Sequence, residues 1–203
     1  MKVIGLLLAA GRGRRFVAAS VPTGSGAPDK LLAAHAGGTV IGHALAALQS
    51  GCDAVIAVIR PDASDALRSA LSAVTCIEAE HADQGMGYSL AAGARACAQA
   101  GADAVLVLPG DMPWLNASTV QQVVRALRVG GPATQRARIV VPALPNGRTG
   151  HPVGFGADHL PALAQLSGER GARGLLDTQP VLCVTVEDAG ILRDVDTPSD
   201  LLP

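Results

Sequence analysis

The sequence predicts an α/β protein in which one domain, spanning residues 1–203, forms a three-layer α/β/α fold around a doubly wound, mainly parallel β-sheet. First, short continuous apolar runs recur, as at residues 3–8 and 54–59, and such runs are typical of strands buried on both faces. Second, these runs alternate with segments that carry apolar residues at helical spacing. Third, 203 residues are enough for one α/β domain with a proper core and too few for two ordinary domains.

The composition excludes several classes of protein. Hydrophobic residues make up 49% of the chain and charged residues 16%, which excludes disorder. Aromatic residues make up only 2%, so binding of single-stranded nucleic acid by stacked aromatic side chains is not expected. A net charge of -1 argues against a general polyanion-binding surface. The sequence contains no apolar stretch of about 18 residues and starts on a strand, so we expect no membrane contact and a cytoplasmic location.

The first half of the chain begins with a strand at Val3–Leu8. Lys30 to Thr39 reads as a short strand and a turn, and a helix then runs from Thr39 or Val40 to Gln49, where Ser50-Gly51 ends it. The following elements, in order, are a strand at Ala54–Ile59, a helix at Pro61–Leu71 and a strand at Val74–Ile77. Cys52, Cys76, Cys97 and Cys183 are widely spaced, which predicts reduced, buried thiols.

The second half repeats the alternation. In order we expect a helix from about Gln84 to Ala100, a strand from Ala104 to Gly110, a helix from Ser118 or Thr119 to Val129, a strand at Ile139–Pro142, glycine-rich turns leading into a helix at 166–176, and a strand at Val181–Val186. Thr197 can cap a last helical turn that has Pro198 at its first position.

The loop after the first strand is suited to an anionic ligand. Ala9, Ala10, Gly11 and Gly13 allow a close backbone approach, and Arg15 with the later Lys30 supplies positive charge. Nucleotides usually bind at this edge of an α/β sheet. The spacing matches neither a Walker loop nor the dinucleotide fingerprint, and a bare Gly-x-Gly more often marks a glycine turn with solvated arginines.

A family resemblance favours the ligand-binding interpretation of this loop over a plain glycine turn. The string Leu8-Ala-Ala-Gly-Arg-Gly-Arg-Arg-Phe16, followed by Lys30, resembles the L-A-A-G-x-G-x-R-M-G…K opening of nucleotidyltransferases that act on nucleoside triphosphates. It is most similar to the molybdenum cofactor cytidylyltransferase and molybdopterin guanylyltransferase group. The resemblance implies the Rossmann-like fold of nucleotide-diphospho-sugar transferases. Two departures are Phe16-Val17 in place of Met-Gly and a long segment from Ala18 to Asp29.

The same resemblance implies which residues bind the nucleotide. From the first loop they are Leu8, Ala9, Ala10, Gly11, Gly13, Arg15 and Lys30. The segment Gly85 to Leu90 resembles the family's G-M-x-x-S-L, which lines the nucleotide pocket and adds Gly85 and Ser89. From the residues alone, Ser89 is equally well explained as a plain helix cap.

Asp111 is the first candidate metal ligand. A buried strand ends at Gly110-Asp111, which places a carboxylate at the same sheet edge as the glycine loop. A carboxylate there suits a hard cation such as Mg²⁺, held partly by water and substrate phosphates, with Mn²⁺ as the alternative. From spacing alone, Asp111 is equally well explained as a residue that caps the turn before Pro113. The match to the family's G-D-M-P favours the metal ligand.

The end of the chain supplies the second carboxylate. Alternation places Asp194 and Asp196 on one face of an extended segment, although acidic residues also cap terminal helices. The string from Asp194 to Leu201 matches the family's D-x-D-T-P-x-D-L ending. That ending implies a metal ligand opposite Asp111, for which we favour Asp196, with Asp194 as neighbour or substitute.

Two later segments resemble the family's acceptor-facing motifs. Residues 146–155 match G-x-x-G-H-P-V and suggest Arg148 and His151 as contacts to a phosphate or a polar heterocycle, while a structural histidine packed against Pro152 remains open. Residues 166–176 match L-x-G-D-x-G-A-R-x-L-L, with Glu169 in place of the aspartate, and suggest Arg173 as an anion partner.

Together these features predict Mg²⁺-dependent nucleotidyl transfer, with Arg15, Lys30 and Asp111 as catalytic residues. The resemblance implies transfer of CMP from CTP to the phosphate of molybdopterin or its molybdenum-loaded form, with release of pyrophosphate. Leu-Ala-Ala-Gly favours the cytidylyl branch over the guanylyl branch. A non-catalytic chaperone of the cofactor that serves a molybdenum hydroxylase client is the alternative from another class.

Overall fold

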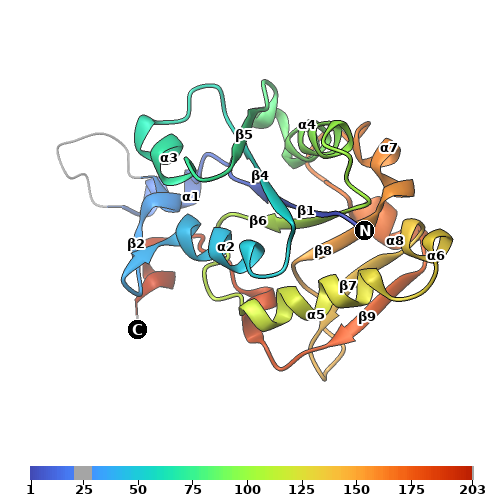
Figure 1. Cartoon of the computed structure of the whole chain (residues 1–203). Coiled ribbons are helices and arrows are strands. Elements are labelled where there is room, and N and C mark those ends of the chain that lie inside the picture. Colours follow the sequence, from blue (N-terminus) through green and yellow to red (C-terminus); the bar gives the residue numbers. More distant parts are fainter. Residues whose placement is uncertain (21–28, 203) are drawn as a thin grey trace.

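The computed structural model describes residues 1–20 and 29–202. Residues 21–28, the middle of the long segment expected between Ala18 and Asp29, lie outside the described residues. A seven-stranded sheet in the order β5-β4-β1-β6-β8-β7-β9 forms the centre of the molecule (Figure 1). Its strands are β1 Val3–Leu8, β4 Ala54–Ile59, β5 Thr75–Glu78, β6 Ala104–Pro109, β7 Ile139–Ala143, β8 Val153–Gly156 and β9 Val181–Thr185.

Most of the sheet is parallel, as predicted. β1 pairs in parallel with both β4 and β6, and its register joins Leu8 to Pro109. β8 is the exception, because it runs antiparallel to β6 and β7. The sequence did not reveal β8, since Gly154 and Gly156 leave it only two apolar side chains and no periodicity. A Cβ at Gly154 would lie 2.8 Å from the end of the Leu127 side chain, so glycine there lets α5 pack closely on the strand without displacing that leucine.

Helices cover both faces of the sheet and complete three layers (Figure 1). On one face, α2 Val40–Gln49 and α5 Ala117–Arg128 bury residues such as Ile41, Leu48 and Val123. On the other face, α4 Met86–Gln99 and α7 Leu160–Leu163 contribute Leu90 and Leu163 to a second core cluster, which also contains Phe155 of β8. The α/β/α architecture predicted from alternating strand and helix patterns is confirmed.

The shorter elements differ more from expectation. They are α1 Arg14–Ala19, α3 Asp65–Ala70, α6 Pro132–Arg136, α8 Arg173–Thr178, a hairpin of β2 Ala34–His35 and β3 Gly38–Thr39, and 3-10 turns at Lys30–Leu32, Ala82–Gln84, Ala157–His159, Ala189–Leu192 and Pro198–Leu201. The helix expected from Pro61 begins only at Asp65, because the Ser64 hydroxyl accepts a hydrogen bond from the Leu67 N–H and caps it there. α6 and α7 are too short for periodicity to predict.

The four cysteines are free thiols, as expected, but they are not all buried. Burial raises the pKa of Cys52 and of Cys97 to about 12, which makes both unreactive. Only Cys97 is fully buried, whereas Cys52 and Cys76 are half-buried. Cys183 is exposed, so the prediction of burial is wrong there, because β9 is an edge strand with much of its surface open. Within residues 1–20 and 29–202, no helix combines the length and the apolar character needed to span a bilayer.

Candidate functional site

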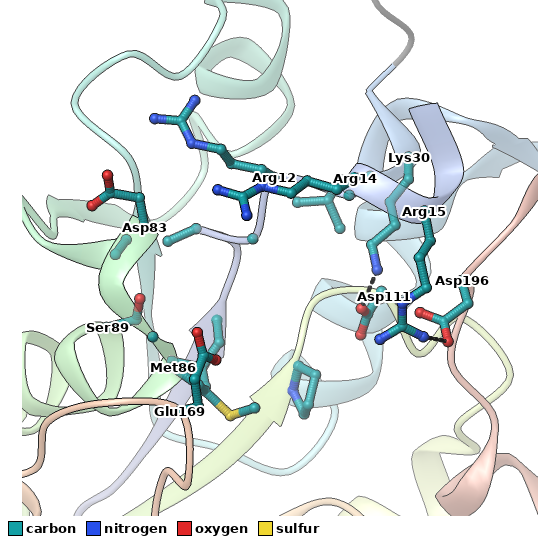
Figure 2. Close-up of a pocket in the computed structure, with 18 residues that line it drawn as sticks. Arg12, Arg14, Arg15, Lys30, Asp83, Met86, Ser89, Asp111, Glu169 and Asp196 are labelled. Carbon is teal, nitrogen blue, oxygen red and sulfur yellow. Dashed lines mark hydrogen bonds and ion pairs between the residues drawn. The ribbon is translucent and has the colours of Figure 1, made fainter. Parts of the chain in front are cut away.

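Two adjoining cavities lie at the carboxyl ends of the parallel strands. The first has a volume of about 470 Å³ and lies between the loop after β1, the start of α4, and Asp111 with Asp196 (Figure 2). The second has a volume of about 870 Å³ and extends toward β8 and the residues before α8. Both are lined by Leu8, Met86, Pro109, Asp111 and Glu169. Asp111 therefore contacts both spaces.

The glycine loop is anchored to Arg60, which follows the neighbouring strand β4. Gly13 adopts a left-handed conformation (φ 57°) at the start of α1, a conformation that favours glycine. The Arg60 side chain, just after β4, donates a hydrogen bond of 2.7 Å to the Gly11 carbonyl. Arg60 and Arg12 both pair with Asp62, at 2.9 and 3.0 Å. Sequence reasoning missed this anchor, since the Arg60-Pro-Asp62 turn carries no ligand motif.

Lys30 and Asp111 form the most enclosed ion pair of the site. The Lys30 Nζ donates to Asp111 Oδ2 at 2.6 Å and to the Val195 carbonyl at 2.9 Å. The two side chains are only 12% and 20% exposed, so solvent screens this pair less than a surface pair. The stem of Lys30 passes close to Gly13. The placement of Lys30 beside the glycine loop agrees with the expectation from the sequence.

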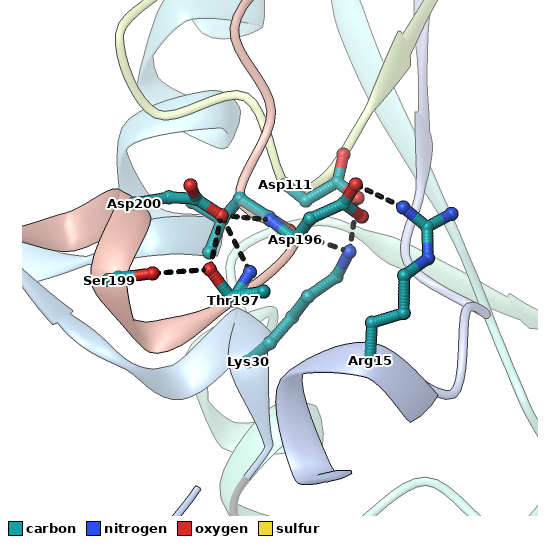
Figure 3. Close-up of polar contacts among 8 residues, drawn as sticks. Arg15, Lys30, Asp111, Asp196, Thr197, Ser199 and Asp200 are labelled. Carbon is teal, nitrogen blue, oxygen red and sulfur yellow. Dashed lines mark hydrogen bonds and ion pairs between the residues drawn. The ribbon is translucent and has the colours of Figure 1, made fainter. Parts of the chain in front are cut away.

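Arg15 and Asp196 form a second, more exposed ion pair beside the first (Figure 3). The Val195 N–H donates to the Asp111 carbonyl at 2.9 Å, which ties the last segment of the chain to the turn after β6. Thr197 and Asp200 form a reciprocal capping box at the final 3-10 turn, as the Thr197-Pro198 pair predicted. The structure thus brings Arg15, Lys30, Asp111 and Asp196 together from four remote segments.

The buried Oδ1 atom of Asp111 fits a contact with a divalent cation. It has no hydrogen-bond partner among the described residues, so it is available to a ligand. Across the part of the chain that the structure describes, no three His, Cys, Asp or Glu side chains gather in metal-binding geometry. A cation held by one or two carboxylates, water and phosphate oxygens is the arrangement that Mg²⁺ prefers. Burial raises the pKa of Asp194, and the charges of Asp111 and Asp196 raise it further.

Most of the predicted nucleotide-binding residues line the first cavity. They are Leu8, Ala10, Gly11, Gly13, Arg15, Lys30, Gly85 and Ser89. Ala9 is not among them, because its side chain lies in the core and its N–H donates to the Val58 carbonyl at 2.8 Å. Ser89 is buried inside α4, whose cap is Gly85, so it is not the helix cap. The sequence reasoning did not single out Asp83 and Met86, which also line the cavity.

The second cavity contains two of the three predicted acceptor residues. His151 and Arg173 line it together with Asp194 and apolar side chains such as Val107 and Phe155. Arg148 lies outside both cavities, in an exposed turn where its carbonyl accepts from the Leu144 N–H. Burial lowers the pKa of His151, while the charge of Asp111 acts in the opposite direction. The Nδ1 atom of His151 is buried and has no hydrogen-bond partner among the described residues.

The glycines that open α4 have a packing reason as well as a place in the cavity. The Gly87 N–H donates to the Gly168 carbonyl at 2.8 Å, which joins the helix start to the loop before α8. A Cβ on Gly85 would lie 2.3 Å from the Gly168 carbonyl carbon, and Gly85 has φ 134°. Both features exclude other residues at this position.

We expect Gly85→Ala to destabilise the protein by about 3 kcal/mol, because the clash is with backbone and the conformation is strained. The measurement is the free energy of unfolding from urea denaturation. Gly174→Ala is the matched control, since a Cβ there meets nothing within 4 Å, and it should change stability by less than about 1 kcal/mol. Equal stabilities for the two variants would contradict the packing role of Gly85.

Comparisons with known proteins agree with this geometry. The family described as the MobA-like NTP transferase domain matches residues 5–183. The purine catabolism protein PucB of Bacillus subtilis is 26% identical over 124 residues, which cover 60% of this chain. The match spans 56% of the length of PucB, little more than half.

Solved structures cover nearly the whole chain. Rv0371c from Mycobacterium tuberculosis is 27% identical, with a TM-score of 0.76 over 98% of this chain and 95% of that one. Its manganese complex is 26% identical, with a TM-score of 0.72 over 98% and 96%. The nucleotidyl transferase Mth528 from Methanothermobacter thermautotroptrophicus is 26% identical, with a TM-score of 0.79 over 99% and 94%.

Proposed function

This chain belongs to the MobA-like NTP transferase domain family, and from that premise we propose that it transfers CMP from CTP to the phosphate of a molybdopterin-type cofactor, with release of pyrophosphate. The observation that carries the proposal is the position of Asp111 at the junction of two cavities. The proposed transfer requires the nucleoside triphosphate and the acceptor phosphate to meet at the α-phosphorus atom. A carboxylate shared by two adjoining spaces suits that requirement.

The first cavity is proposed to bind the nucleoside triphosphate. Its glycine loop allows close approach of the phosphates, and Arg15 and Lys30 would offset the charge on the departing pyrophosphate. Asp111 and Asp196 would hold Mg²⁺, with Asp194 as neighbour or substitute. When bound, Mg²⁺ would neutralise charge on the α-phosphate and the attacking oxygen. The manganese complex of Rv0371c supports a divalent metal and keeps Mn²⁺ as an alternative.

The second cavity is proposed to bind the acceptor. Its apolar walls suit a flat heterocycle, while the exposed Arg173 suits an anionic group and the neutral His151 suits a polar ring atom. The acceptor oxygen belongs to a phosphate monoester, which is already ionised, so in-line attack on the α-phosphorus requires positioning more than a strong general base. A role of Arg148 in acceptor binding remains a prediction, because it would require the turn that carries Arg148 to move toward the second cavity.

A guanylyltransferase that makes the guanine dinucleotide form is the nearest alternative, since the same triphosphate contacts serve either base. A non-catalytic chaperone of the cofactor is the alternative from another class. PucB is named a purine catabolism protein, which is compatible with a client hydroxylase that acts on heterocycles.

The deciding experiment is pyrophosphate release with CTP, GTP, ATP and UTP in turn, each with Mg²⁺ and with molybdopterin present or absent. We expect release with CTP that depends on the pterin. Preference for GTP would assign the guanylyl reaction instead. If no triphosphate gives pyrophosphate release and the protein nevertheless binds the pterin, the result would favour the non-catalytic chaperone over the enzyme.

A further inference from the structure

Asp188 is a buried carboxylate that lines neither cavity. It is 5% exposed and begins the 3-10 turn Ala189–Leu192, shortly after β9. Its Oδ2 atom accepts hydrogen bonds from the Asn116 N–H at 2.9 Å and from the Thr119 hydroxyl at 2.7 Å. Its Oδ1 atom accepts from the Gly190 N–H at 2.9 Å. Three neutral donors therefore satisfy one buried charge.

These donors come from two different segments. Asn116 and Thr119 belong to the start of α5, at the end of the connection from β6 that carries Asp111. Gly190 belongs to the last segment of the chain, which continues to Asp194 and Asp196. A carboxylate near a helix N-terminus is also favoured by the helix dipole. Asp188 thus joins the two segments that supply the acidic side chains of the site.

Close backbone contacts continue this connection toward the site. A Cβ on Gly190 would lie 2.2 Å from the Trp114 carbonyl oxygen, so the two backbones touch. The His151 N–H donates to the Ile191 carbonyl at 2.9 Å, and the Val195 N–H donates to the Asp111 carbonyl at 2.9 Å. Residues 188–195 are therefore fastened at both ends and in the middle. Release of the Asp188 end would free this segment to shift relative to Asp111.

We propose that Asp188 is a positioning residue that fixes the distance between Asp111 and the carboxylates of Asp194 and Asp196. It acts through the backbone of residues 189–195 and touches neither substrate. The consequence for catalysis rests on the proposed function, because it requires those carboxylates to share a divalent cation. The structural consequence, fixed packing of the Val195 amide against Asp111, does not.

The test compares Asp188→Asn with the wild type by two measurements. Asparagine keeps the shape but presents an NH₂ group to a site built from donors, so one connection breaks. We expect the Mg²⁺ concentration for half-maximal pyrophosphate release to rise about tenfold, with the KM for the triphosphate changed less than about twofold. Hydrogen exchange of the Val195 amide, followed by NMR, should accelerate by about tenfold.

If Asp188→Asn does not fold, Thr119→Val is measured in its place, because this variant removes one hydrogen-bond donor and leaves the Asp188 carboxylate intact. It should shift both measurements in the same direction, and Thr119→Ser, which keeps the hydroxyl, should restore them. Asp53→Asn is the matched control, because Asp53 likewise accepts from a backbone N–H and from Arg128, but at the opposite edge of the sheet. It should leave Val195 exchange and Mg²⁺ dependence unchanged.

The outcomes separate this inference from the proposed function. Faster Val195 exchange in the Asp188 and Thr119→Val variants supports the positioning role even if the wild type releases no pyrophosphate, which would overturn the proposed function alone. Unchanged exchange in both variants overturns the positioning role. If the wild type is active, Mg²⁺ dependence that is unaltered in both variants overturns the positioning role, whatever the exchange of Val195 shows.

Discussion

Asp111→Asn is expected to lower kcat for pyrophosphate release by about 10³-fold. The side chain lies at the junction of both cavities, and its Oδ1 atom is buried with no hydrogen-bond partner in residues 1–20 and 29–202. The variant keeps the shape and removes the charge, so a divalent cation would lose its most enclosed ligand. Steady-state kinetics at saturating triphosphate and Mg²⁺ measure the effect.

The control for Asp111→Asn lies at the other end of the same strand. Asp103 directly precedes β6 and accepts a hydrogen bond from the Lys2 N–H at 2.6 Å, far from both cavities. Asp103→Asn should leave kcat within about twofold of the wild type, because surface substitutions away from a site have small effects. Full turnover in Asp111→Asn would remove this residue from the metal site.

Lys30→Ala is expected to raise the KM for the triphosphate by about 10- to 100-fold, since a hydrogen bond to a charged group contributes about 1.5–3 kcal/mol. The ammonium group lies beside the glycine loop, and Asp111 and the Val195 carbonyl orient it. The dissociation constant of the acceptor should change much less, because Lys30 lines only the first cavity. The measurements are the KM for the triphosphate and calorimetric binding of molybdopterin.

Lys2→Ala is the control for this prediction. Its ammonium group donates to the Ala100 carbonyl at 2.7 Å, on the exposed edge opposite the site. We expect both the KM and acceptor binding to match the wild type. A KM in Lys30→Ala equal to that of the wild type would exclude Lys30 from the triphosphate site, whereas equal losses for triphosphate and acceptor would indicate a structural role.

A single substitution in the Lys30–Asp111 pair leaves one group without its charged partner, which complicates the interpretation of the measured effect. Asp111→Asn leaves the Lys30 ammonium group without its carboxylate partner, and Lys30→Ala leaves the partly buried Asp111 carboxylate without its cationic partner. The double variant Lys30→Ala with Asp111→Asn therefore belongs in the series, because its difference from the summed single effects isolates their interaction.

The sequence by itself determined the parallel part of the sheet and the position of the glycine loop at its carboxyl edge. β1 and β4 have the predicted bounds because a continuous apolar run between turn residues has few other solutions in an α/β domain. Gly11, Gly13 and Asp111 could be predicted to lie near one another because parallel strands bring their carboxyl ends to one edge, which makes residues that follow different strands neighbours in space.

Only the tertiary structure decided which of these side chains meet. Lys30 pairs with Asp111 across 81 residues, and Arg15 with Asp196 across 181, and such contacts leave no trace in local periodicity. The same is true of the antiparallel β8, of Arg60 behind the glycine loop, and of Asp188 between two segments. Local sequence patterns indicate which residues face a core. The pairing of polar groups depends instead on how distant segments pack against one another, and for this reason only the tertiary structure shows the geometry of this site.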